Sequence, residues 1–153
     1  MSFSIGHHQL AAPVVLAPMA GVTNAPFRAL CRRYAPGLVY VNEMVMATPV
    51  VHGNSKTERM ISFAPDERPR SLQLYGSDPE MMGRAVDRLC AGDRVDHIDL
   101  NFGCPANKVT RRGGGAAVPA RPALLRRILR AAVRSATPSG VPVTAKFRMG
   151  LWD

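Results

Sequence analysis

The side chain best suited to chemistry is the thiol of Cys104, in the segment Asn101-Phe102-Gly103-Cys104-Pro105. Gly103 permits a backbone turn that other residues resist, and Pro105 fixes the direction in which the chain leaves it. A free thiol has a pKa of about 8.5, so at neutral pH it mostly keeps its proton. The sequence therefore predicts a general acid at Cys104, held where a strand ends.

Polar and apolar side chains alternate along three segments that we interpret as strands. One face carries the polar sets, namely Ser71, Gln73 and Tyr75, then His97, Asp99 and Asn101, then Thr144, Lys146 and Arg148. The carboxyl ends of the predicted strands hold Glu43, Gln73, Asn101 and Lys146. Each alone is more simply an internally hydrogen-bonded residue, but all four at strand ends favour a binding site.

The elements that must position these residues alternate between strand and helix. The predicted strands cover residues 13–17, 38–42, 71–75, 95–100 and 141–147, and helices are expected to begin at Asn24, Asp78 and Pro122, with a short one near 55–61. This alternation is typical of βα units around a parallel sheet. An open sheet covered on both faces would bury the polar rows without partners, whereas a barrel interior accepts them. We therefore predict an α/β fold of the TIM, or (β/α)8, barrel type.

The loop after the cysteine segment combines Arg111 and Arg112 with three glycines, Gly113 to Gly115. Backbone amides of a glycine run can form a nest for an anion, and two arginines beside it can grip an RNA phosphate. A mobile loop leading to the next helix is the competing interpretation. We keep both arginines as candidate substrate-binding residues.

Composition is that of one globular domain with a basic surface. Hydrophobic residues make up 46% and charged residues 20% of the 153, and the formal net charge is +9. This excess favours a polyanionic partner, although an arginine-rich proteome would produce it as well. In the predicted helix from Pro122, an apolar stripe runs through Leu124, Leu125, Ile128, Leu129, Ala132 and Val133, with Arg126, Arg130 and Arg134 opposite. That arginine row is more simply a solvated face than an RNA contact.

Several other classes of protein do not fit the sequence. The three cysteines, Cys31, Cys90 and Cys104, have no CxxC or CxxH spacing, so we expect neither a disulfide framework nor a metal site. The first residues lack the charged and apolar regions of a signal peptide, and no apolar run reaches membrane-spanning length. We expect a soluble protein of the reducing cytoplasm that does not bind membranes.

Four runs of residues together resemble the tRNA-dihydrouridine synthases. They are Ala17-Pro18-Met19-Ala20-Gly21-Val22-Thr23-Asn24, then Gln73 and Gly76 in SLQLYGSDP, then Asp99-Leu100-Asn101-Phe102-Gly103-Cys104-Pro105 with Lys108-Val109, and Lys146 in VTAKFRMG. The resemblance extends from about Ile5 to the last residue, in order and spacing. Any one run is a modest signal, whereas the combination is highly specific.

The resemblance implies an oxidoreductase with bound FMN that uses NADPH to reduce the C5=C6 bond of uridine in tRNA. It implies that Pro18, Met19 and Ala20 contact the flavin ring and that Gln73 and Lys146 hydrogen-bond its pyrimidine edge. Asn101 would orient the uracil, and Cys104 would protonate C5 after hydride reaches C6. Glu43 is added here as a substrate-binding candidate because of its place at a strand end.

The chain departs from this family in length. A (β/α)8 barrel needs roughly 250 residues, so we expect residues 1–153 to form a partial FMN-binding barrel domain, truncated after about the fifth strand. The later strands, the phosphate-binding loops and the helical tRNA-binding domain would be absent, and with them the choice of tRNA position. An open sheet edge favours self-association and argues against activity of the chain by itself.

Two alternatives to that function stay open at this point. One is a non-catalytic basic RNA-binding or inert fragment. The other is a different FMN barrel acting on a free pyrimidine, such as a dihydroorotate dehydrogenase, against which the APMAGVTN and GCPANKV runs weigh.

Overall fold

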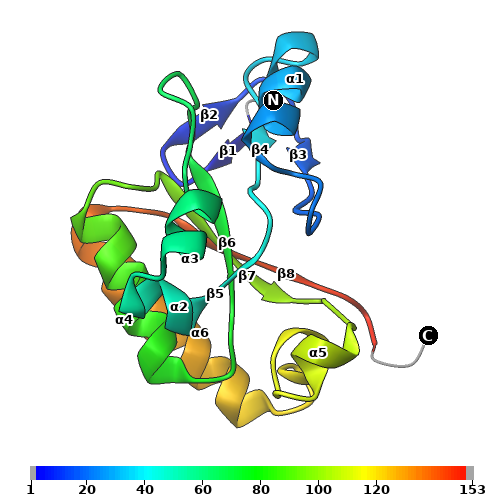
Figure 1. Cartoon of the computed structure of the whole chain (residues 1–153), viewed down its shortest axis with the longest axis vertical. Helices are drawn as coiled ribbons and strands as arrows, with labels where there is room; N and C mark the ends of the chain where they lie inside the picture. The colour runs from blue at the N-terminus through cyan, green and yellow to red at the C-terminus, as the bar shows by residue number, and fades with distance from the viewer. Residues whose placement is uncertain (1–2, 151–153) are drawn as a thin grey trace.

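The computed structural model describes residues 3–150, which form a parallel sheet with helices along one side (Figure 1). Four strands pair in chain order, β5 (Val45–Met46), β6 (Ser71–Tyr75), β7 (His97–Phe102) and β8 (Val143–Phe147). Two more, β3 (Val15–Leu16) and β4 (Val39–Tyr40), pair in parallel, and Val41 bridges to Ser71 of β6. Parallel neighbours in chain order are the arrangement found in a (β/α)8 barrel.

Helices connect the parallel strands. Helix α1 (Ala25–Tyr34) follows β3, α2 (Ala47–His52) and α3 (Ser55–Met60) follow β5, α4 (Pro79–Ala91) follows β6, and α6 (Pro122–Ala136) follows β7. Asn24 accepts from the Phe27 amide and Asp78 from the amides of Glu80 and Met81, so both helices begin at the predicted caps. A short α5 (Asn107–Thr110) and the 3-10 turns η1 (Gly115–Ala117) and η2 (Thr137–Ser139) complete these connections.

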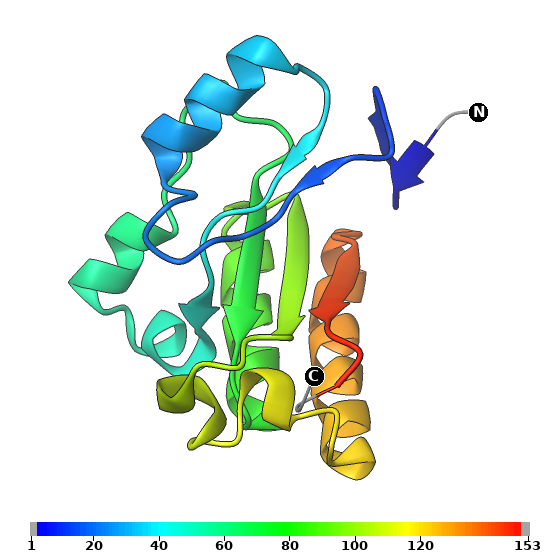
Figure 2. The same ribbon diagram turned by 90° about the vertical axis from the view of Figure 1, so that its right-hand side faces the viewer.

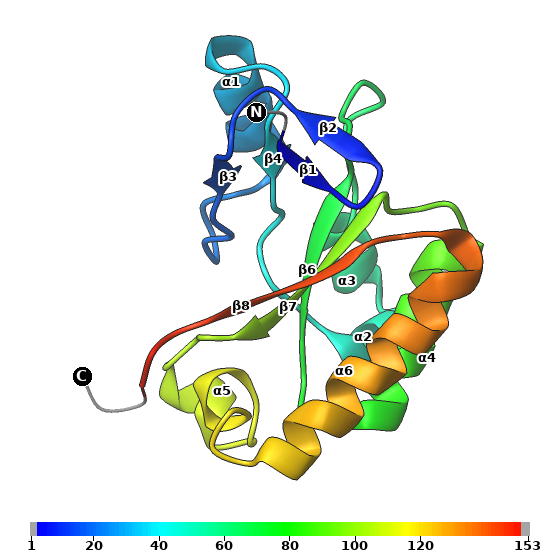
Figure 3. The ribbon, with the colours of Figure 1, turned by 180° about the vertical axis from the view of Figure 1, so that it is seen from behind.

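The main core lies between the sheet and two helices that run side by side. Helices α4 and α6 lie together behind the strands in Figure 2, and Figure 3 shows them from the outside. Apolar side chains from both layers are buried there, among them Leu72, Leu74, Ile98 and Leu100 of the strands and Met82, Leu89, Ile128 and Ala132 of the helices. The strands therefore direct their polar residues to the opposite face, as the alternating pattern predicts.

The structure differs from the predicted elements at several points. The second predicted strand is shortened, since only Val39–Tyr40 of residues 38–42 form β4, and β5 begins at Val45, beyond the predicted end. Between the two strands the side chain of Asn42 bonds to Arg28 and to the Met60 carbonyl. The fourth strand begins at His97 and extends to Phe102, two residues beyond its predicted end. Val133, predicted to lie in the apolar stripe, is 49% exposed.

A few elements of the structure were not predicted from the sequence. An antiparallel hairpin of β1 (Phe3–Ile5) and β2 (His8–Leu10) precedes the sheet, and neither α2 nor α5 was predicted. Within residues 3–150 the strands do not close into a barrel. The assignment of residues 1–153 to a partial barrel domain stays a prediction.

Candidate active site

A chain of side-chain hydrogen bonds crosses the polar face of the sheet. Asn101 Nδ2 donates to Gln73 Oε1 at 2.8 Å, and Gln73 Nε2 donates to Asp99 Oδ2 at 2.6 Å. The hydroxyl of Thr144 donates to the other carboxylate oxygen of Asp99 at 2.6 Å. Burial raises the pKa of Asp99, while hydrogen bonds from Thr144 and Gln73 and the charge of Lys146 act in the opposite direction. The three neighbouring strands β6, β7 and β8 are thereby fixed relative to one another.

The same chain continues toward the amino ends of the strands through His97. Its Nε2 lies 2.9 Å from Thr144 Oγ1, and its Nδ1 lies 2.7 Å from Ser71 Oγ. Burial lowers the pKa of His97 to about 4, and the neighbouring His8 adds to this effect. The imidazole is therefore neutral at physiological pH, with both ring nitrogens engaged by hydroxyl groups.

Asn101 also determines the shape of the cysteine loop. Its Oδ1 accepts from the amide of Gly103 at 3.1 Å and from the amide of Cys104 at 2.9 Å. The side chain of Asn101, next to the last residue of β7, thus holds the following turn in place, as asparagine does in many turns. A single residue couples the polar chain of the sheet to the thiol.

The glycine run, Gly113 to Gly115, packs against the backbone of the cysteine loop. Gly115 has a φ of +56°, and a Cβ there would lie 2.5 Å from the carbonyl oxygen of Cys104. The next amide, that of Ala116, donates to this carbonyl at 3.0 Å. The amides of Gly113 and Gly114 donate to Thr110 and Val109, so they do not form the predicted anion nest. All three glycines of the loop are buried.

Most of the predicted site residues line one cavity of about 230 Å³ at the carboxyl ends of the strands. The residues around it are Pro18, Ala20, Met44, Gln73, Asn101, Gly103, Cys104, Pro105 and Lys146. Six of them were predicted as site residues, and they come from four separate stretches of the chain. Cys104 and Lys146 therefore line the same cavity, together with Gln73 and Asn101.

Four predicted residues do not line this cavity. Met19 is 39% exposed, and its backbone bonds to the Thr23 hydroxyl. The Glu43 carboxylate accepts from the amide of Gly21 at 2.8 Å, so it stabilises the 18–24 loop. Arg111 and Arg112 are exposed beyond α5, outside the cavity.

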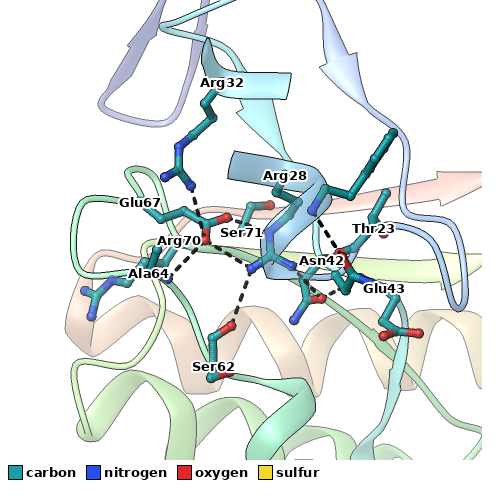
Figure 4. A network of polar contacts seen from close by, with 12 residues as sticks. Thr23, Arg28, Arg32, Asn42, Glu43, Ser62, Ala64, Glu67, Arg70 and Ser71 are labelled. Carbon is teal, nitrogen blue, oxygen red and sulfur yellow. Dashed lines mark hydrogen bonds and ion pairs between the residues drawn. The ribbon is translucent and has the colours of Figure 1, made fainter. Parts of the chain in front are cut away.

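A buried ion pair, which the sequence analysis missed, anchors the loop that carries Pro18 and Ala20 (Figure 4). Arg28 and Glu67 are each 1% exposed, and Arg28 Nε lies 2.5 Å from Glu67 Oε1. Arg28 Nη1 donates to the Thr23 carbonyl at 2.8 Å and to Asn42 Oδ1 at 3.0 Å. The sequence gives little signal for this pair, because the two residues are far apart in the chain and an arginine in a helix is usually exposed.

The described part of the chain shows neither a metal centre nor a membrane span. No group of three or more metal-binding side chains comes together among residues 3–150. In the same residues, no helix has the length and apolar character needed to cross a bilayer.

Comparison with known proteins gives a consistent result. Residues 15–153 match the family described as Dihydrouridine synthase (Dus). The chain is 50% identical to a protein of Mycobacterium tuberculosis named "Probable tRNA-dihydrouridine synthase", over 97% of this chain and 40% of that protein. It is 46% identical to a Mycobacterium leprae protein of the same name, over 91% of this chain and 43% of the relative.

A more distant relative is the "tRNA-dihydrouridine synthase B" of Vibrio parahaemolyticus. Identity there is 40%, over 97% of this chain and 44% of that protein. The chain thus spans somewhat less than half the length of the curated relatives it matches.

Proposed function

The chain belongs to the dihydrouridine synthase family, and from this premise we propose that the protein reduces uridine to 5,6-dihydrouridine in tRNA, with FMN as cofactor and NADPH as reductant. The observation that carries the proposal is the cavity shared by a thiol, an amine and two carboxamides. The names of the relatives support the substrate. A cytoplasmic location is part of the same proposal.

The cavity fits one end of a flavin ring. Pro18, Ala20 and Met44 offer apolar contacts, which suit the faces of a flat aromatic ring. Gln73 uses one N–H and one lone pair within the protein, so a second N–H and a second lone pair remain for a pyrimidine edge. Lys146 would supply positive charge where reduced flavin is negative. When bound, FMN would carry hydride from NADPH to C6 of the uracil.

The chain's own residues would orient the base and deliver the proton. Asn101 Nδ2 has Gln73 as one partner and the sulfur of Met44, at 3.3 Å, as the other. A uracil carbonyl is a stronger acceptor than a thioether, so it would replace Met44 as the second partner. Cys104 would donate its proton to C5. The target base must first turn out of the folded tRNA to reach the cavity.

The test compares Cys104→Ala with Cys31→Ala, because Cys31 lies in α1, outside the cavity. The purified protein is expected to be yellow, and as part of a complete (β/α)8 barrel it should form dihydrouridine in an unmodified tRNA transcript supplied with NADPH. Loss of a general acid typically lowers turnover by about 10²–10⁴-fold, so Cys104→Ala should show that loss and still contain FMN. Cys31→Ala should keep both properties.

The other outcomes are equally informative. A colourless protein that binds tRNA would support the non-catalytic RNA-binding alternative. Reduction of free pyrimidines, with tRNA left unmodified, would support the other class of FMN barrel. Full turnover by Cys104→Ala would remove this thiol from the reaction.

A further inference from the structure

The net positive charge of the protein comes from one part of the chain. Residues 1–99 contain ten Lys and Arg and ten Asp and Glu, whereas residues 100–152 contain ten Lys and Arg and no acidic residue. Residues 1–99 therefore have no formal net charge. The whole excess belongs to the segment that forms α5, the glycine loop, α6 and β8.

The arginines of the two parts also differ in their partners. In the first part, Arg28, Arg32, Arg70, Arg88 and Arg94 each lie within 3.4 Å of a carboxylate oxygen. In helix α6, by contrast, Arg126, Arg127, Arg130 and Arg134 are exposed, and none has a carboxylate within 4.0 Å in residues 3–150. Like charges three or four residues apart destabilise a helix unless an anion compensates them. This row lacks such an anion among residues 3–150.

Three of these arginines border a groove between two helices. Arg127, Arg130 and Arg134 line it together with Ala131 of the same helix and with Pro79 and Glu80 of α4, around a space of about 550 Å³. The acidic residue Glu80 lies 3.9 Å from Arg84, which offsets part of its charge. The groove therefore combines a concave shape with a net positive lining.

The groove lies beside the candidate active site and does not overlap it. Helix α6 begins near α5, at the carboxyl edge of the sheet, and runs back along the outer side (Figures 2 and 3). Arg111 and Arg112 follow α5 at that same edge. Basic residues thus follow α5 at the carboxyl edge of the sheet and recur along α6. From Arg127 to Arg134 the helix rises about 10 Å, roughly the length of three stacked nucleotides.

We infer that the groove formed by Arg127, Arg130 and Arg134 binds the sugar-phosphate backbone of RNA outside the nucleotide that reacts. The inference rests on the proposed function, because tRNA is the polyanion which that function brings to the cavity. An anionic membrane is a poorer match, since a helix that lies in a lipid surface inserts a broad apolar face, whereas Val133 is the one large apolar side chain exposed on α6. Here Ile128, Ala132 and Ala136 are buried against the protein.

The experiment compares two triple variants with the same loss of charge. Arg127→Gln, Arg130→Gln and Arg134→Gln are combined in the test variant. Arg33→Gln, Arg68→Gln and Arg88→Gln, all exposed and in the balanced part of the chain, form the control. Glutamine keeps helix propensity, so both variants should fold. Binding of an unmodified tRNA transcript is measured over a series of salt concentrations.

We expect the test variant to bind tRNA more weakly at low salt, for all tRNA sequences alike. A plot of the logarithm of the tRNA association constant against the logarithm of salt concentration has a negative slope. The magnitude of this slope should decrease by about two to three, since each lost phosphate contact removes about 0.7–0.9. The control should keep the original slope. Equal slopes in the two variants would overturn the inference. So would loss of binding to phosphatidylserine vesicles without any change in tRNA binding, which would assign the groove to membranes.

Activity and flavin content separate this inference from the proposed function. If both are correct, the test variant keeps its FMN and its kcat at saturating tRNA, and only KM rises. A protein without FMN would reject the proposed function, while the salt slopes would still decide whether the groove binds RNA. A lower kcat with unchanged tRNA binding would contradict a docking role.

Discussion

The backbone around Cys104 is held from two directions. Asn101 accepts the amide of the cysteine, and the glycine loop supports its carbonyl, so the peptide groups on both sides of the thiol have fixed partners. A general acid needs this constraint, because an error of an ångström in position can cost about a hundredfold in rate. Support from the glycine loop therefore matters to the thiol as well as to stability.

Gly115→Ala tests that support. Its Cβ would lie 2.5 Å from the Cys104 carbonyl, and φ is +56°, so we expect both destabilisation and slower formation of dihydrouridine. Gly140→Ala is the matched control, since Gly140 has a φ of +65° but no atom within 4 Å of a new Cβ. Both changes should lower the free energy of unfolding by about 1–3 kcal/mol, because alanine is strained at a positive φ. Only the first should lower turnover, and equal turnover in the two variants would show that the glycine does not position Cys104.

His97 gives the native state a dependence on pH. Its pKa is lowered to about 4 in the folded protein, against about 6.5 when unfolded. Between these values the unfolded chain binds more protons, so stability is complete above pH 6.5 and is lost as the pH falls toward 4. Urea unfolding at pH 7.5 and pH 5 should show a loss of about 2 kcal/mol from this residue.

The His97 contribution is isolated by comparison with His97→Gln, which cannot titrate. Asp99 acts in the opposite sense, because its raised pKa makes the folded protein bind protons more readily. Asp99 is present in both proteins, so its effect cancels in the comparison. The free energy of unfolding of the wild-type protein, minus that of His97→Gln, should grow as the pH rises from 5 to 7.5. A difference that stays constant over this range would show that His97 does not titrate between pH 4 and 6.5.

Among the elements, α1 is tied to the cavity by a buried ion pair. The Glu67 carboxylate faces Arg28 and also lies 3.3 Å from Arg32 Nη1, so it compensates two guanidinium groups. Glu67→Gln should cost about 3–5 kcal/mol of unfolding free energy, because it leaves charge buried without a partner. Asp66→Asn removes the exposed partner of Arg32 and should cost less than about 1 kcal/mol.

The readout for these two variants includes the cofactor. Arg28 holds the carbonyl of Thr23, in the loop that brings Pro18 and Ala20 to the cavity. Loss of Glu67 should therefore also increase the dissociation of FMN, measured by recovery of its fluorescence. Equal stability of the Glu67→Gln and Asp66→Asn proteins would contradict the anchoring role.

The predictable elements are those whose signals are local. Helices at Asn24, Asp78 and Pro122 were predicted because capping residues and proline act within one turn. Alternation along β6 and β7 identified the polar face, and with it Gln73 and Asn101. The shortness of β4 and the presence of β5 could not be predicted, since Asn42 between them bonds to residues distant in the chain.

The same distinction applies to the site. Cys104 and Lys146 were identifiable from residue type, strand position and family resemblance, and the structure brings them to one cavity. The positions of Met19, Glu43, Arg111 and Arg112 outside it depend on how loops fold over the sheet. The Arg28–Glu67 pair depends on burial, which neither residue type nor spacing reveals.

At the scale of the whole molecule, exposed apolar residues lie on an outer strand of each of the two parallel sheets. Phe147 on β8 is 70% exposed and Val15 on β3 is 43% exposed. We expect residues 1–153, prepared alone, to associate as concentration rises, because such edges offer unpaired strands and apolar area. Sedimentation velocity should show this, with Phe147→Ser reducing it. Tyr34→Ser, at an 84% exposed site on α1, should not, and a monomer at all concentrations would contradict the expectation.

The unequal distribution of charge gives the molecule an electric dipole, with its positive pole on the side of α5 and α6. A dipole of this kind experiences a torque in the field of a nucleic acid, and the torque acts before any contact forms. The protein would therefore tend to arrive already turned, with the mouth of the cavity near the RNA. Fewer encounters would then bring residues 1–99, which have no formal net charge, to the RNA.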